Sequence, residues 1–253
     1  MTRLLAEMTS PEVGLAVESG ALALIPVGSM EAHGPHLPVG TDCLLAEDIS
    51  KELALRLELD GVNTVIVPTI PYSVAECARG FPGTISLRGE TVEAILVDVA
   101  GNLAEHGFRQ AAILCFHLEP KNAEHVQSAA RTIRETLGLE IDELFVSTSA
   151  VWLPRLRSII ETRLRQDLHG GEMETSIMLR LRPELVRENW KQLPPTDVDI
   201  IEIAAAGIPF RDVGPGYFGA PARSSADKGE RIMALLVSAL AQAVQELLGK
   251  RKT

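Results

Sequence analysis

Short apolar runs alternate with longer amphipathic runs along the first half of this chain. The runs at 21–27 and 110–116 are almost continuously apolar, which is typical of strands covered on both faces. Between and around them, 44–59 and 89–106 carry apolar residues at helical spacing. Strands that alternate with helices of this length predict an α/β fold with a mostly parallel central sheet covered by helices on both faces.

The remaining pattern extends this arrangement towards the C-terminus. We predict strands at 64–72 and 143–151, a helix at 122–137, and a final N-capped helix whose apolar face runs through 232–248. The segment 194–219 is rich in Pro and Gly, and we expect a long loop that serves as a lid or a subunit contact.

Composition limits the partners that this chain can have. Its 253 residues are 46% hydrophobic, so residues 1–253 can form one domain with a substantial core. The net charge of −10 argues against binding to nucleic acid or an anionic membrane, which leaves a small molecule or another copy of the chain. Glu7 interrupts any signal-peptide core, so we expect a cytoplasmic protein. Three widely spaced cysteines predict buried thiols rather than disulfides.

A Gly- and Pro-rich turn that contains several potential metal ligands follows the first predicted strand. Glu31 and His33 are separated by one residue, so an extended backbone points both to the same side, and Asp42 can fold back across the turn. Carboxylate and imidazole together suit Zn²⁺, Mn²⁺ or Fe²⁺ better than Ca²⁺. The alternative is a polar loop without a metal, but such crowding is costly without a cation.

Two further segments place similar residues after predicted strands. His117 and Glu119 follow the strand at 110–116, and ligands of parallel sheets gather beyond the carboxyl ends of the strands. His169 precedes two glycines and a predicted helix whose first turn contains Glu172 and Glu174. Negative charge is favoured at a helix N-terminus, so ordinary helix-end charge is the alternative explanation for these glutamates.

Four segments together resemble the signatures of the creatininase (creatinine amidohydrolase) family. They are PVGSMEAHGPHLPVGTD at 26–42, FPGT at 81–84, HGGEMETS at 169–176 and SADKG at 225–229. The segments occur in the family's order and span nearly the whole chain. The resemblance implies a three-layer α/β sandwich, a homo-oligomer that is often a hexamer, and two divalent metal ions per subunit (Zn²⁺, Mn²⁺ or Fe²⁺, with Zn²⁺ as the first choice).

The resemblance also implies roles for individual residues. Carried over by position, the metal ligands are Glu31, His33, Asp42, His117 and Glu119, with Asp42 as the bridge. His169 matches the acid/base or substrate-contacting histidine of the family. Glu174 matches a glutamate that acts near or at the metals in some relatives, so either Glu119 or Glu174 completes the metal shell.

Two positions depart from creatininases proper. Leu118 replaces an aromatic residue, and Arg165 replaces a tryptophan, so two flat surfaces that could hold a planar ring are missing. The departures argue against creatinine as the substrate. Arg165 and Lys121 instead favour an anionic or polyhydroxylated substrate.

The expected reaction is hydrolysis of a cyclic amide or a related C–N bond by water that two metal ions activate. The same site could act on a formamide, a peptide terminus or a C–C bond of a cyclic diketone such as an inositol-derived ketone. A metal-binding scaffold without activity is the non-enzymatic alternative. Serine or cysteine nucleophiles are disfavoured because the chain has no Gly-x-Ser-x-Gly motif.

Overall fold

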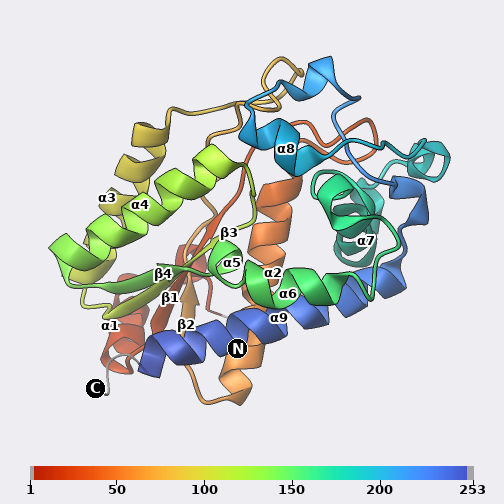
Figure 1. Cartoon of the computed structure of the whole chain (residues 1–253). Helices are drawn as coiled ribbons and strands as arrows, with labels where there is room; N and C mark the ends of the chain where they lie inside the picture. The colour runs from red at the N-terminus through yellow and green to blue at the C-terminus, as the bar shows by residue number, and fades with distance from the viewer. Residues whose placement is uncertain (1–2, 250–253) are drawn as a thin grey trace.

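The computed structural model describes residues 3–249, which contain a four-stranded sheet (Figure 1). The strands are β1 (Leu22–Val27), β2 (Thr64–Ile66), β3 (Gln110–Cys115) and β4 (Glu140–Glu143), and their order across the sheet is β2-β1-β3-β4. Each neighbouring pair is parallel. The α/β fold with a parallel central sheet is therefore confirmed.

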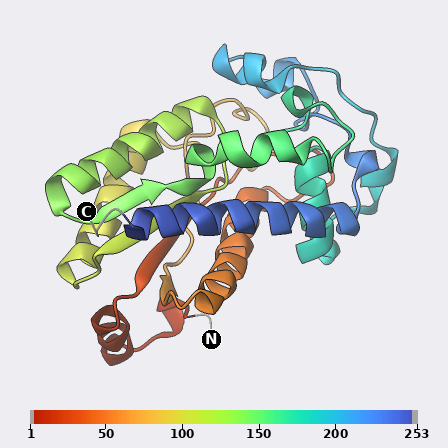
Figure 2. The same cartoon turned by 60° about the horizontal axis from the view of Figure 1, so that its bottom comes forward.

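Helices cover both faces of this sheet. Their bounds are α1 (Ser10–Glu18), α2 (Thr41–Leu59), α3 (Gly89–Glu105), α4 (Pro120–Leu137), α5 (Leu144–Ser147), α6 (Ser149–Leu156), α7 (Glu172–Leu181), α8 (Ile200–Ala205) and α9 (Ala226–Gly249). Leu22 and Leu24 of β1 pack in one buried cluster with α2, α6, α7 and α9, whereas Ala23 and Ile25 pack in another with α3 and α4. Alternate strand residues thus face opposite helical layers, which gives the three-layer sandwich. Figure 2 shows α9 running along one side of the sheet, with α3 and α4 on the other.

The predicted strand at 143–151 is wrong. Strand β4 ends at Glu143, and the chain turns at once into α5 and then α6. The Glu143 carboxylate accepts hydrogen bonds from the backbone amides of Phe145 and Val146, at 2.7 and 2.9 Å, and so caps a helix. The apolar run that suggested a strand instead packs into the core, where Trp152 is fully buried and donates its indole N–H to the carbonyl oxygen of Phe145.

The predicted strand at 64–72 is real but much shorter. Strand β2 ends at Ile66, because Pro68 and Pro71 have no amide hydrogen to donate to a neighbouring strand. Ile70 makes one further parallel bridge to Val27.

The segment 194–219 contains the short helix α8, which the loop prediction did not include.

The C-terminal helix follows the sequence prediction. The hydroxyl of Ser225 accepts a hydrogen bond from the backbone amide of Lys228 and caps α9. By length and composition α9 could cross a membrane, but 50% of its most apolar window is buried within the protein. Its apolar face is explained by packing against α2, α6 and α7.

Cys77 and Cys115 are buried free thiols, as predicted, and Cys43 is a half-buried one.

Candidate metal centre

The ends of β1 and β3 and the start of α2 meet at one point. Glu31 and His33 follow β1, whereas Asp42 lies in the first turn of α2. Gly28 allows the close approach of these segments, because a Cβ there would lie 2.5 Å from the backbone nitrogen of Cys43. A side chain at this position would push the carboxylate-bearing turn away from the strand.

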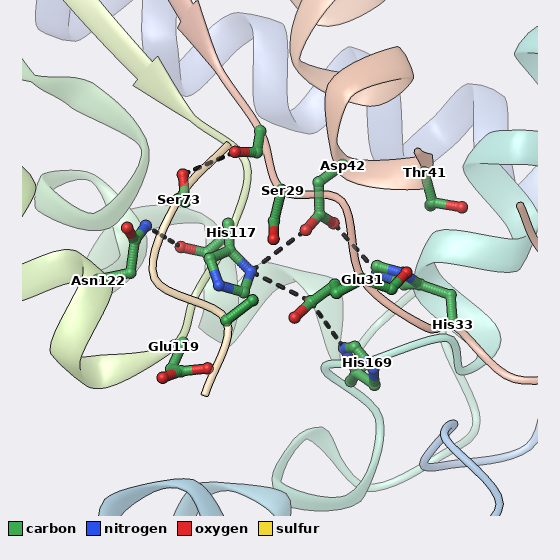
Figure 3. Close-up of polar contacts among 12 residues, drawn as sticks. Ser29, Glu31, His33, Thr41, Asp42, Ser73, His117, Glu119, Asn122 and His169 are labelled. Atoms are coloured by element: carbon green, nitrogen blue, oxygen red, sulfur yellow. Dashed lines mark hydrogen bonds and ion pairs between the residues drawn. The ribbon is translucent and has the colours of Figure 1, made fainter. Parts of the chain in front are cut away.

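The imidazole of His117 enters from the neighbouring strand. Val27 and Cys115 are register partners in β1 and β3, so both strands end at the same level. The Nδ1 atom of His117 lies 3.1 Å from Oε1 of Glu31 and 3.2 Å from Oδ2 of Asp42 (Figure 3). These three side chains are buried and form one group that could hold a metal ion.

A second group adjoins the first through the same aspartate. Nε2 of His33 lies 3.1 Å from Oδ1 of Asp42 and 3.6 Å from Oε2 of Glu174, which comes from the first turn of α7. His33, Asp42 and Glu174 could hold a metal ion as well. The two oxygens of Asp42 therefore face two different histidines, which is the geometry expected of a bridging carboxylate.

Hydrogen bonds to backbone carbonyl groups set the orientation of the imidazoles. Nε2 of His117 lies 2.7 Å from the carbonyl oxygen of Val74, and Nδ1 of His33 lies 3.1 Å from that of Glu31. A carbonyl oxygen only accepts, so the nitrogen facing it carries the proton. In the neutral ring, the other nitrogen presents a lone pair towards the carboxylates, as metal-ligating histidines do.

The centre strongly favours positive charge. Burial lowers the pKa of His33, but the carboxylates of Asp42, Glu174 and Glu31 outweigh it and raise that pKa to about 10. Burial also opposes ionisation of Asp42, yet His33 and His117 bring the pKa of that carboxyl down to about 2. Burial raises the pKa of Glu174 to about 7, although His33 opposes this shift. A cation at this point would be stabilised by the same carboxylates.

Three buried polar atoms support a metal ion in this position. Within residues 3–249, Oε2 of Glu31, Nε2 of His33 and Oδ2 of Asp42 have no hydrogen-bond partner. Buried polar atoms are normally paired, because an unpaired one costs about 1–3 kcal/mol. The donor set of oxygen and nitrogen atoms fits Zn²⁺, Mn²⁺ or Fe²⁺.

His169 lies beside the two groups, and with Glu31 and His33 it forms a third group that could hold a metal ion. Its Nε2 is 2.8 Å from the carbonyl oxygen of Ala32, so Nδ1 carries the lone pair, 3.5 Å from Oε1 of Glu31. The ring also contacts those of His33 and Phe210, with centroids 4.4 and 4.8 Å away. Burial, assisted by the nearby His33, lowers the pKa of His169 to about 3.

One predicted ligand, Glu119, does not belong to any of the possible metal-ligand groups that the described residues form. Its two oxygens accept hydrogen bonds from the backbone amides of Glu76 and Cys77, at 3.2 and 3.1 Å. It is nevertheless buried beside the same cavity, and burial raises the pKa of its carboxyl group. Geometry therefore favours Glu174 over Glu119 as the carboxylate that completes the second group.

A cavity of about 90 Å³ opens onto these residues. Leu118 lines it, but Arg165 and Lys121 do not. Arg165 is paired with Asp199, and Lys121 with Glu76, both at exposed positions. The expectation that these two cations contact the substrate is therefore not supported.

One protein-family model matches nearly the whole chain. The family model for creatininase, described as creatinine amidohydrolase, matches residues 6–244. The chain belongs to the creatininase family. It is a hydrolase of this family, with the fold that the sequence resemblance implied.

Individual creatininase-family proteins are similar along most of their length. Creatinine amidohydrolase from Pseudomonas putida is 29% identical over 259 aligned positions, which cover 95% of each chain. Mycofactocin precursor peptide peptidase from Mycobacterium tuberculosis (strain ATCC 25618 / H37Rv) is 31% identical, covering 85% of this chain and 80% of its own. A solved manganese form of creatininase superposes with a TM-score of 0.74 at 26% identity, covering 97% of this chain and 98% of the other.

Sequence reasoning missed the residues that hold α7 in place. The buried carboxylate of Asp167 accepts hydrogen bonds from the backbone amides of Glu172 and Met173, at 2.6 and 2.9 Å. Glu172 is also buried and accepts hydrogen bonds from Thr162. Ordinary helix-end charge therefore does not fully explain this glutamate. Asp and Glu near a helix start are too common to identify such contacts from sequence alone.

Proposed function

We propose that this creatininase-family chain hydrolyses an amide-type C–N bond of a small substrate at two metal ions that share Asp42. The observation that carries this proposal is that the two oxygens of Asp42 face different histidines, each beside one further carboxylate. Glu31, Asp42 and His117 would hold one ion, and His33, Asp42 and Glu174 the other. Zn²⁺ is the first choice, with Mn²⁺ and Fe²⁺ as alternatives.

The metal ions and the chain would contribute different parts of the chemistry. When bound, the ions supply Lewis-acid activation of water and of the substrate carbonyl. The buried ligand side chains exclude bulk water from the centre and hold it in place through their backbone contacts. The cavity would orient the substrate so that its scissile bond lies beside the centre.

His169 and Glu119 are positioned to move protons. The lone pair on Nδ1 of His169 can accept a proton, which the same atom can then deliver to the leaving nitrogen. Glu119 lines the cavity, and burial raises its pKa, so its carboxylate can also exchange a proton with water there. The sequence resemblance left open which of these two carboxylates completes the metal shell. We assign Glu174 to the metal shell and Glu119 to proton transfer.

Metal analysis with two variants tests these assignments. We expect about two transition-metal ions per chain in the natural protein. His169→Gln and Glu119→Gln should keep that content while turnover of an amide substrate falls by about 10²- to 10⁴-fold. Equal loss of metal and turnover in Glu119→Gln would make Glu119 a ligand instead. A natural protein that binds no metal on titration with Zn²⁺ or Mn²⁺ would contradict the proposal and favour the scaffold alternative.

The bond attacked need not belong to a cyclic amide. A relative named as a peptide peptidase supports a peptide terminus as a second candidate, since the same activated water would serve both. Parallel assays with creatinine, short peptides, formamides and cyclic diketones would separate these reactions. We expect creatinine to be a poor substrate, because Leu118 lines the cavity where an aromatic ring would be needed to hold a planar ligand.

We infer, in addition, one domain spanning residues 1–253, assembly into a homo-oligomer that is often a hexamer in this family, and a cytoplasmic location. Light scattering coupled to size-exclusion chromatography would test the assembly. A monomer at micromolar concentration would contradict it.

A further inference from the structure

The wall of the cavity is divided sharply between ionisable and apolar side chains. The ionisable lining residues all belong to the proposed centre, and they are Glu31, Asp42, His117, Glu119, His169 and Glu174. The rest of the lining is apolar, and its main members are Leu118, Leu168, Ile200, Ile201, Ala204 and Phe210. We call these six residues the apolar wall.

Four separate segments of the chain build the apolar wall, and Leu168 and Phe210 each come from a segment of their own. Leu118 follows β3 and lies next to His117, whereas Ile200, Ile201 and Ala204 come from α8. Ile200 is 4% exposed and packs with Phe210, but Ile201 is 40% exposed. An exposed isoleucine at the edge of a cavity has apolar surface that a bound ligand could still cover.

Polar substrates would find few partners on this wall. Among the described residues, no Lys, Arg, Ser, Thr, Asn or Gln side chain lines the cavity. An anionic group would have only the proposed metal ions to neutralise it, and would meet the buried carboxylate of Glu119. A hydroxyl or amide group lying against Leu118 or Ile200 would lose its hydrogen bonds to water.

We propose that the substrate carries an uncharged aliphatic or aromatic side chain beside its scissile bond, and that this side chain lies against the apolar wall. This inference rests on the proposed function, because it needs the scissile bond at the metal centre. It narrows the small substrate of the proposed function to one with an apolar side chain, and it argues against anionic and polyhydroxylated compounds.

Hydroxamates provide a binding test that does not depend on turnover, because their head group chelates metal ions. The protein would be loaded with Zn²⁺ and titrated by calorimetry with four probes: acetohydroxamate, 4-methylpentanohydroxamate, succinamic hydroxamate and succinic monohydroxamate. The last three have tails of similar length that are apolar, polar and anionic. We expect the apolar tail to bind roughly 10- to 200-fold more tightly than its polar counterpart, and the anionic tail most weakly.

The outcomes separate the two proposals. If acetohydroxamate binds and the three longer probes bind equally, or the polar or anionic tail binds best, the apolar-wall inference is overturned while the metal centre stands. If no probe binds to the Zn²⁺-treated protein, the proposed metal centre is contradicted, and so is the inference that depends on it.

A matched pair of variants locates the tail. Ile201→Asn should reduce the preference for the apolar tail by roughly 3- to 10-fold and leave acetohydroxamate binding unchanged. Leu55→Asn is the control, because Leu55 is 52% exposed on α2 and does not line the cavity. An unchanged preference in Ile201→Asn would overturn the assignment of the tail to this wall.

Discussion

The two sides of the candidate metal centre are built in different ways. On the sheet side, Glu31 and His117 follow adjacent parallel strands, and Asp42 begins the helix packed against one of them. On the α7 side, Glu174 lies in a segment held by side chains that bind backbone amides, with Asp167 as the main contact. The sheet side depends on backbone pairing and apolar packing, whereas the α7 side depends on buried polar contacts.

This difference matters for how each side tolerates change. Loss of apolar contacts under the sheet should lower the stability of the whole fold, because the strands are its core. Loss of a buried hydrogen-bonding carboxylate near α7 should disturb the centre more than the fold. Substitutions on the two sides should therefore differ in the size of their effect and in whether they change folding stability or metal binding.

The largest expected effect comes from the shared aspartate. Asp42→Ala should remove both metal ions and lower turnover by at least about 1000-fold, because each proposed group loses a ligand. Glu174→Ala should remove only the ion on the α7 side and retain about one per chain. Metal analysis of the purified variants measures both, with Asp60→Asn, a surface residue paired with Arg56, as the control. Equal metal loss in both variants would mean that the two sides of the centre do not bind their metal ions independently.

A core substitution tests the sheet side. Leu24→Ala in β1 should lower the free energy of unfolding by about 2–5 kcal/mol, because Leu24 is fully buried between the sheet and α2. Denaturant titration measures this change. Leu55→Ala, at an exposed position of α2, should change it by less than about 0.5 kcal/mol. Similar losses in the two variants would argue against the sheet as the stabilising element.

The stability of the fold should also depend on pH through Glu143, which ends β4. Burial raises the pKa of Glu143 to about 7, despite the amide hydrogen bonds that it accepts. Because the native state then binds this proton more tightly than the unfolded state, its contribution to stability is greatest below pH 4.5 and decreases as pH rises towards 7, by about 3 kcal/mol. The stability difference between the natural protein and Glu143→Gln, measured from pH 4.5 to 7.5, isolates this effect. A difference that does not change with pH would contradict it.

The smallest effect on stability is expected on the α7 side. Asp167→Asn should cost about 1–3 kcal/mol, because the amide group places a donor against one of the two backbone N–H groups. The same change should weaken binding of the metal ion held by Glu174 by about 10- to 100-fold. Calorimetric metal titration detects this, and Asp212→Asn, at an exposed position, is the control. Unchanged metal affinity would mean that Asp167 does not influence metal binding at the centre.

Much of the centre could be predicted before the structure. The spacing of Glu31 and His33, and the position of His117 after a strand, required only the periodicity of an extended chain and the rule that parallel strands end together. The structure brings both histidines to Asp42. The relative roles of Glu119 and Glu174 were left open, because both carboxylates follow a strand or begin a helix beside a histidine.

The sequence by itself determined the α/β class, the sheet side of the centre and membership of a recognisable family, because local hydrophobic periodicity and short motifs carry that information. Only the tertiary structure decided that Glu174 approaches His33, that Glu119 is held by backbone amides, and that α8 completes an apolar wall. These features depend on contacts between segments far apart in the chain. Such contacts leave no periodic signal, since they depend on the direction in which each buried side chain points.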